Sequence, residues 1–348
     1  MAAIETAFMA VAFGEQVAQG TILAATRDLA GALDLTNGIV LGDKESGQME
    51  SGISISFVRE GRDRPVVGGS QTWQQDEFLR QQVGTFSVAF PFSGNRKTTT
   101  TPLDAEFQQD PGIEAILKAC GLTSAADGSG VGWEYLPGAA TYATAKVWTG
   151  VGAESQSWAL LDCIGSLSIS KGPGGIPIAT ATFQAIMDTY AGAIAMPTFD
   201  YEEQSSVSAK IIESMGASWG GVRGWSDLTL NIDNDVQLIA DSNALNGERA
   251  KTGERNVNVS MTMFDDDVVG IEYAQLNQVL AAAPTDDLTF TTGTNAGGAA
   301  ALDYIISVNN LQITEDLTPD RVGGEHSTTV TARASGTTAN SEFSLIFR

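Results

Sequence analysis

Short segments in which hydrophobic and polar residues alternate recur along this chain and predict a mainly β protein. Successive side chains of a strand point to opposite faces of a sheet, so each segment separates a buried face from a wetted one. Clusters of Gly, Asp, Asn, Ser and Thr lie between the segments, as expected for turns. The clearest segments are SGISISFV at 51–58, GTFSVAFPF at 84–92, DLTLNID at 227–233 and RNVNVSMTMF at 255–264.

Two other segments have the period of a helix. In DPGIEAILKACG at 110–121, Asp110 suits the N-cap and Gly121 suits a left-handed helix end. DDDVVGIEYAQLNQVL at 265–280 begins with acidic residues that favour a helix N-terminus. The apolar faces predicted for these helices consist of Ile113, Ile116, Leu117 and Cys120, and of Val269, Tyr273, Leu276 and Leu280.

The two helical segments occupy the same place in an order of elements that occurs twice. Each follows a strand, a long polar loop (61–78 or 233–254) and a second strand. We interpret this as a duplication that gives tandem domains at 1–195 and 196–348. The alternative is that a β-rich chain repeats the order by chance. Further strands are expected after the helices, at 141–148, 157–170, 176–187, 287–292, 302–313, 326–335 and 342–347.

Alternation also predicts which side chains face the cores and which face water. The expected core side chains are Ile53, Ile55, Phe57, Phe86, Val88, Phe90, Leu228, Leu230, Ile232, Val257, Val259, Met261 and Met263. The opposite faces carry small polar side chains, namely Ser54, Ser56, Ser87, Thr229, Asn231, Asp233, Asn256, Asn258, Ser260 and Thr262. These faces have no row of lysines that would bind phosphate groups.

Composition narrows the range of functions. The 348-residue chain has 42 acidic and 19 basic residues, a net charge of −23. Such a chain should not adhere to DNA or to anionic membranes. The charge fits solubility, a salty habitat, or a surface that stays near nucleic acid without binding it. No apolar run has membrane length and the N-terminal residues lack a basic region, so we expect synthesis in the cytoplasm and no membrane partner.

Catalytic and cofactor signals are weak. GASWG at 216–220 fits the G-x-S-x-G nucleophile pattern, and His326 follows Ser218 in the chain, but a turn and a strand are expected after the serine where that pattern needs a helix. We expect Cys120 and Cys163 to be buried, reduced thiols. The acidic segment 231–248 lacks the spacing of a calcium loop. We therefore expect no enzyme activity, no metal and no cofactor.

The chain resembles the major tail proteins of bacteriophages, the subunits that form the tail tube of long non-contractile (siphovirus) tails. The resemblance covers most of the chain and is one of pattern and order. The residues that carry it are ETAFMAVAFGEQVAQG, ISISFVREGRDRPVVGG, GTFSVAFPFSGN leading into GIEAILKACGL, WALLDCIGSLSISKGPGGIPIATATFQAIM, and LTLNIDNDV running to GERNVNVSMTMF.

The resemblance implies two tandem tail-tube-like domains of the β-sandwich or barrel type, each with one flanking helix and a long inter-strand loop. Such subunits form rings that stack into a tube around a tape-measure protein and later pass double-stranded DNA without binding it specifically. Two domains per chain imply three chains in a pseudo-sixfold ring, and a hexamer of one larger domain is the alternative. The different loop lengths of the two halves weaken their equivalence.

The resemblance also assigns roles and partners. The polar residues named above would line the lumen, and loop residues would contact neighbouring subunits or rings: Arg62, Arg64, Trp73, Arg249 and Arg255. The tail terminator and distal tail proteins would be further partners in the virion. The alternatives are a capsid decoration or baseplate protein, a serine hydrolase acting through Ser218, and a secreted binding module, for which a signal peptide would be expected.

Overall fold

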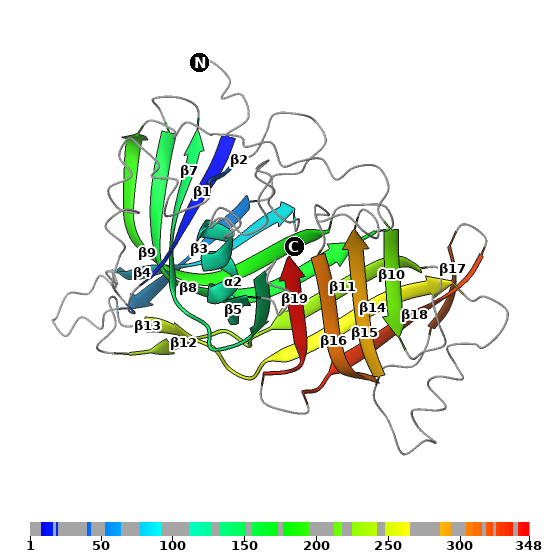
Figure 1. Ribbon diagram of the computed structural model, residues 1–348. Helices are drawn as coiled ribbons and strands as arrows, with labels where there is room; N and C mark the ends of the chain where they lie inside the picture. Colours follow the sequence, from blue (N-terminus) through cyan, green and yellow to red (C-terminus); the bar gives the residue numbers. More distant parts are fainter. Residues whose placement is uncertain are drawn as a thin grey trace, which may run out of the picture.

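The fold is mainly β, as the alternating segments predicted, and most strands belong to one large antiparallel sheet (Figure 1). Strands β12 and β13 pair with each other as a separate hairpin. The computed structural model describes residues 8–16, 19, 40–42, 53–63, 77–91, 111–126, 133–150, 155–172, 177–194, 212–217, 225–241, 248–264, 286–293, 304–314, 318–322, 325–336 and 340–347.

The described first half contains one short helix, α2, among its strands. Its elements are β1 (Phe8–Glu15), β2 (Val40–Gly42), β3 (Ile53–Asp63), β4 (Glu77–Pro91), α2 (Pro111–Ala119), β5 (Leu122–Ala126), β6 (Trp133–Pro137), β7 (Ala143–Gly150), β8 (Ser155–Lys171) and β9 (Ile178–Ile194). The elements of the second half are β10 (Ile212–Ala217), β11 (Trp225–Asp233), β12 (Gln237–Ala240), β13 (Glu248–Lys251), β14 (Asn256–Phe264), β15 (Asp286–Gly293), β16 (Tyr304–Ile313), β17 (Thr318–Val322), β18 (Glu325–Ala334) and β19 (Phe343–Phe347).

The core lies on the apolar side of these strands, where alternation placed it. Buried and half-buried residues alternate along the whole of β14. In the first half, the rings of Phe13, Phe86 and Phe183 meet with centroids 5.4 to 5.8 Å apart. The predicted core residues of β4, β11 and β14 are buried, which confirms those assignments. The side chains of Ile53, Ile55 and Phe57 lie outside the described part of the structure.

Helix α2 confirms the first helical prediction. Ile116 and Leu117 of its predicted apolar face are buried, as is Cys120 just after its end, whereas the side chain of Ile113 lies outside the described part. Gly121 has φ +80°, so the chain leaves the helix through the left-handed conformation that glycine adopts most readily. Lys118 ties the helix to β1, because its Nζ lies 2.9 Å from Glu15 and 3.0 Å from Glu114. The second predicted helix, at 265–280, falls outside the described residues.

One order of strand pairing occurs twice in the sheet. The first series runs β3-β4-β9-β8-β7-β1, each strand antiparallel to the next. The second series runs β11-β14-β18-β16-β15-β10, again all antiparallel. Corresponding strands also follow one another in the same order along the chain. In Figure 1 the first series gathers on the left and the second on the right.

The register agrees between the two series. In the first, Ile164 lies opposite Gln184, Gln184 opposite Thr85, and Thr85 opposite Ser56. In the second, the chain of opposite residues is Gln312, Arg333, Asn258 and Asn231. Each strand can therefore be aligned with its counterpart, residue by residue, from the pairing alone.

A bulge in the same place marks both series. In β7 and β8, Ala143 lies opposite Cys163 and Ala145 opposite Leu160, so a two-residue step faces a three-residue step. In β15 and β16 the same step separates the pair Asp286–Leu311 from the pair Leu288–Val308. The residue inside each bulge has positive φ: Asp162 has 52° and Asn310 has 51°.

Two loop predictions need correction. The segment 61–78 is strand at both ends, because β3 continues to Asp63 and β4 begins at Glu77. The segment 233–254 contains the β12–β13 hairpin. Both were predicted as loops because their polar residues do not alternate with apolar ones. Backbone pairing, which needs no apolar side chain, forms these strands.

Candidate assembly and channel surface

A continuous row of small polar residues crosses the sheet from the first series to the second. Ser87 of β4 lies opposite Thr182 of β9, and Thr182 lies opposite Ser166 of β8. From β8 the sheet continues into β11, where Ser168 lies opposite Asn231. We call this surface the polar face. Its described members are Thr85, Ser87, Ser166, Ser168, Ser170, Thr180, Thr182, Gln184, Thr229, Asn231, Asp233, Asn256, Asn258, Ser260, Thr262, Thr329, Thr331 and Arg333.

Side-chain hydrogen bonds join neighbouring strands across the polar face. The Ser168 hydroxyl donates to Asn231 Oδ1 at 2.6 Å, and the Ser166 hydroxyl donates to Asp233 Oδ1 at 3.0 Å. Both bonds connect β8 to β11, and so connect the first series to the second. Further along the face, the hydroxyls of Thr262 and Thr329 are 3.0 Å apart and Arg333 donates to Asn256 Oδ1 at 2.6 Å.

The residues predicted to line a lumen lie on this one face wherever their side chains are described. Asn231 and Asp233 are exposed, whereas Ser87, Thr229, Asn256, Asn258, Ser260 and Thr262 are half-buried. Ser54 and Ser56 lie on β3, but their side chains are outside the described part. The structure thus brings together the polar residues of the two halves; that the face lines a channel stays a prediction.

Sequence reasoning missed the part of the polar face on β8, β9 and β18. The signal is present in the sequence, because SLSIS, ATATFQA and TTVTARA alternate as clearly as SGISISFV or DLTLNID. The same alternation rule assigns their polar residues to this face. These strands matter because β9 and β8 are the strands that connect Ser87 to Asn231 without interruption.

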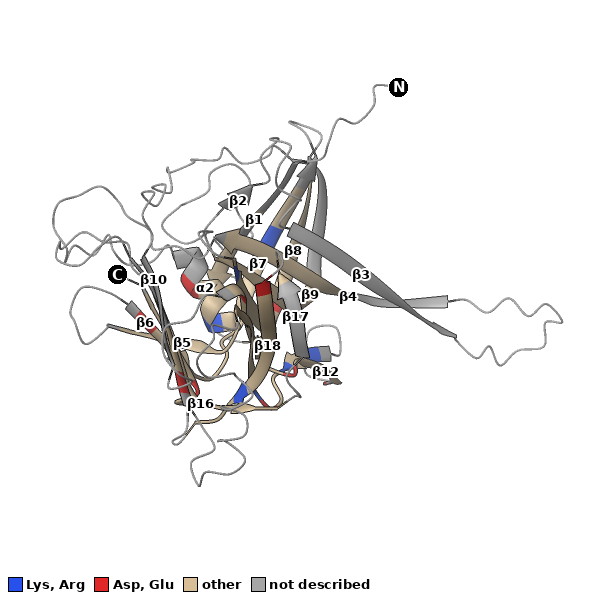
Figure 2. Cartoon of the chain, turned by 90° about the vertical axis from the view of Figure 1, so that its right-hand side faces the viewer, with Lys and Arg blue, Asp and Glu red and all other residues tan. Residues whose placement is uncertain are grey.

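The polar face carries few charges. Of its members, Asp233 and Arg333 are charged, and Asp227 adds an exposed acid at the start of β11. Figure 2 shows the described strands as mostly tan, with isolated acidic and basic residues. Hydroxyl and amide groups hydrogen-bond to water but attract phosphate far less strongly than lysine or arginine does. This surface is wet and offers few cations to an anionic polymer.

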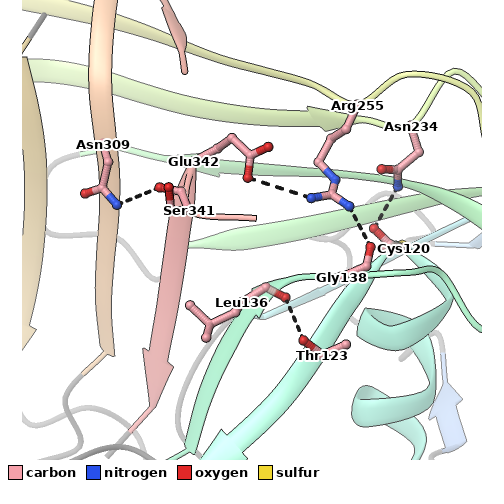
Figure 3. A network of polar contacts seen from close by, with 9 residues as sticks. All are labelled: Cys120, Thr123, Leu136, Gly138, Asn234, Arg255, Asn309, Ser341 and Glu342. Atoms are coloured by element: carbon pink, nitrogen blue, oxygen red, sulfur yellow. Dashed lines mark hydrogen bonds and ion pairs between the residues drawn. The ribbon is translucent and has the colours of Figure 1, made fainter. Parts of the chain in front are cut away.

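A second polar cluster links residues of the first half to residues of the second half (Figure 3). Asn234, 3% exposed, donates 2.7 Å hydrogen bonds to the carbonyls of Cys120 and Gly165. Arg255 donates to the Gly138 carbonyl at 2.6 Å and lies 3.8 Å from Glu342. Burial lowers the pKa of Arg255, and the negative charge of Glu342 opposes that effect.

The residues predicted to contact other subunits are placed as follows. Arg255 has partners within its own chain, as just described. Arg249 on β13 forms an ion pair with Asp241 at 3.2 Å. Arg62 lies on β3 opposite Phe78, with its side chain outside the described part. Arg64 and Trp73 lie outside the described residues. A contact of any of these residues with another subunit stays a prediction.

The remaining chemical candidates can be placed only in part. Ser218 lies outside the described residues, whereas His326 is exposed on β18 opposite Arg321. Cys120 and Cys163 are free and buried, as predicted, and burial raises the pKa of both thiols. Within the described residues, no group of three or more His, Cys, Asp or Glu could hold a metal ion. No helix in that part is long and apolar enough to span a membrane.

Comparison with known proteins assigns this chain to no family, since no family model and no curated protein matches it. We therefore infer its function from the polar face and the repeated strand order.

Proposed function

We propose that this chain is a virion protein, the subunit of a bacteriophage tail tube that self-assembles into stacked rings. The observation that carries the proposal is the polar face, which runs from β4 of the first series to β18 of the second through the β8–β11 pairing. A sheet with one apolar side and one wet, weakly charged side is what the wall of a water-filled conduit requires.

The repeated strand order supports a duplication, because both the register and the bulge recur. Each series then corresponds to one tail-tube-like domain, the first within 1–195 and the second within 196–348. Three chains would place six similar domains around a pseudo-sixfold ring. A ring of six chains, each acting as one larger unit, is the alternative.

The proposed mechanism is passive conduction. The net charge of −23 repels DNA from the wall, and the polar face holds water without binding phosphates. Double-stranded DNA then passes without forming contacts that must be broken at each step. Before ejection the same lumen would hold the tape-measure protein. The tail terminator and distal tail proteins would bind the two ends of the tube.

Negative-stain electron microscopy of the purified protein over a range of concentrations tests this proposal. Rings or tubes with a central channel are the expected result, and sedimentation velocity should show a matching fast species. A folded protein that remains monomeric at high concentration would contradict the proposal. A hydrolase acting through Ser218 would instead lose ester hydrolysis in Ser218→Ala, a change that should leave tube formation intact.

A further inference from the structure

The pairing of β8 with β11 is the place where the first series joins the second. The two strands are antiparallel from the pair Leu228–Lys171 to the pair Ile232–Leu167. The C-terminal part of β8 lies between β9 on one side and β11 on the other. This junction buries two strand edges that would otherwise be free, and the hydroxyl of Ser168 reinforces it by donating to Asn231.

One partner in this junction, β11, has β3 as its counterpart in the first series. The register makes Ser56 the counterpart of Asn231. Ser56 lies opposite Thr85, Asn231 lies opposite Asn258, and Thr85 and Asn258 are counterparts. Yet β3 differs from β11 in its surroundings. In the described part of the chain, β3 pairs with β4 alone, so no described strand pairs with its other edge.

The other partner, the C-terminal part of β8, has β17 as its counterpart. Ser168 lies opposite Thr180 of β9, and Thr318 of β17 lies opposite Thr329 of β18. Thr180 and Thr329 are themselves counterparts. Thr180 lies four residues before Gln184, and Thr329 lies four residues before Arg333, the counterpart of Gln184. Within the described residues β17 pairs with β18 alone. Among the described strands, β3 and β17 each therefore have one edge without a partner, and these edges correspond to the two that meet in the β8–β11 junction.

Strands β3 and β17 are thus the counterparts of β11 and β8, the two strands that pair within one chain. We infer that β17 of one copy pairs antiparallel with β3 of the next copy, with Thr318 opposite Ser56 as Ser168 lies opposite Asn231. The inference rests on the proposed self-assembly and specifies its interface. The same pairing would then continue the sheet, and with it the polar face, from chain to chain.

The residue types at the two edges are polar at the equivalent positions. Serine and threonine stand at 56 and 318, the counterparts of Asn231 and Ser168, whose side chains form a hydrogen bond. Pro319 has no N–H, so β17 brings one backbone donor fewer to this ladder than β8 does. The interface joins two different surfaces, and repetition of such a contact gives either a closed ring or an open helix. In the proposed tube this contact returns to the first copy after three chains and so closes a ring.

Cysteine cross-linking tests the register directly. The variant Ser56→Cys/Thr318→Cys is allowed to assemble, treated with a short bis-methanethiosulfonate reagent, and run on a denaturing gel without reductant. We expect covalent dimers and trimers to take up most of the protein, with the ladder ending at three chains. The native cysteines should not interfere, because Cys120 and Cys163 are fully buried.

Matched variants supply the controls. Ser168→Cys/Asn231→Cys reproduces the same contact within one chain, so it should cross-link in the monomer and run as a compact single chain. The mixture of Ser56→Cys chains with Thr318→Cys chains should give dimers and nothing larger. Ser54→Cys/Thr318→Cys is out of register by two residues and should give at least fivefold less cross-linked product.

The outcomes separate the interface from the proposed function. If microscopy shows rings or tubes and the Ser56–Thr318 variant gives no more product than the out-of-register control, the inference is wrong and the tube proposal stands. If the chain folds, as the internal Ser168–Asn231 cross-link would show, but neither assembles nor cross-links between chains, both are wrong.

Discussion

Asp162 and Asn310 occupy the same position in two copies of one strand arrangement. Each lies inside a bulge with φ near +50°, Asp162 in β8 and Asn310 in β16. Asp and Asn are among the few residues other than glycine that adopt this conformation readily. The backbone N–H of each donates to a side-chain oxygen, from Gln16 in the first case and Asp287 in the second. A shared, unusual backbone feature is stronger support for duplication than strand order alone.

The positive φ at Asn310 predicts an inverted order of stability for two small substitutions. Asn310→Gly should be more stable than Asn310→Ala by about 1 kcal/mol, because alanine pays a steric cost in the left-handed region. Urea unfolding of both variants measures the difference. At Gln312, an exposed strand position, the order should reverse, with alanine the more stable. Equal stabilities at Asn310 would contradict the structural role of its conformation.

Asn234 should be one of the most sensitive polar positions in the chain. Asn234→Ala leaves the carbonyls of Cys120 and Gly165 without their donor and should cost about 2–3 kcal/mol of unfolding free energy. Asn234→Asp keeps the shape but replaces the donor with an acceptor, so it should cost at least as much. The exposed control Gln237→Ala should remain within about 0.5 kcal/mol of the wild type. Chemical denaturation compares all three variants.

The strands that sequence predicted well are those with one buried and one wet face. In β11, β14 and β18 the apolar and polar residues alternate, and the predicted bounds differ from the observed ones by at most two residues. Short strands such as β5, β12 and β13 are not predicted, because hydrophobic and polar residues do not alternate in LTSAA, QLIA and ERAK. Their pairing depends on backbone partners brought together by the rest of the fold.

The equivalence of the two series is hidden in the sequence for a physical reason. Counterpart core positions are both buried but carry side chains of different size. Phe86 corresponds to Val259, and Phe183 to Ala332, because different neighbours fill each core. The repeated order of strands, loop and helix could be seen, but the register needed the pairing. That no described strand pairs with the outer edges of β3 and β17 likewise follows only from the strand pairing.

The buried thiols predict a loss of stability at alkaline pH. Burial raises the pKa of Cys120 and Cys163 above the ordinary value of 9.0, so above pH 9 the unfolded chain loses these protons and the folded chain keeps them. Unfolding is then favoured by about 1.4 kcal/mol per thiol for each further pH unit. Between pH 8 and pH 10 the free energy of unfolding should decrease less in Cys120→Ala/Cys163→Ala than in the wild type, as measured by denaturant unfolding curves at both pH values. Equal decreases would contradict the prediction.

A positive charge on the polar face should convert a passive wall into one that binds DNA. Asn231→Lys adds one lysine per chain at an exposed position of the face, whereas Gln237→Lys adds it at an exposed position of the β12 hairpin. Assembled tubes are sedimented with a short fluorescent DNA duplex at low salt. The first variant should retain several-fold more DNA than the second, and added salt should remove the difference. Equal retention would show that Asn231 does not face the channel.

A cryo-electron microscopy reconstruction of the assembled protein tests whether the polar face lines the channel of a tail tube. We expect a tube of stacked rings in which Ser87, Thr182, Asn231 and Ser260 face the central channel and the apolar side of the sheet is covered. Assemblies in which these four residues lie on the outer wall, or are buried between chains, would contradict it.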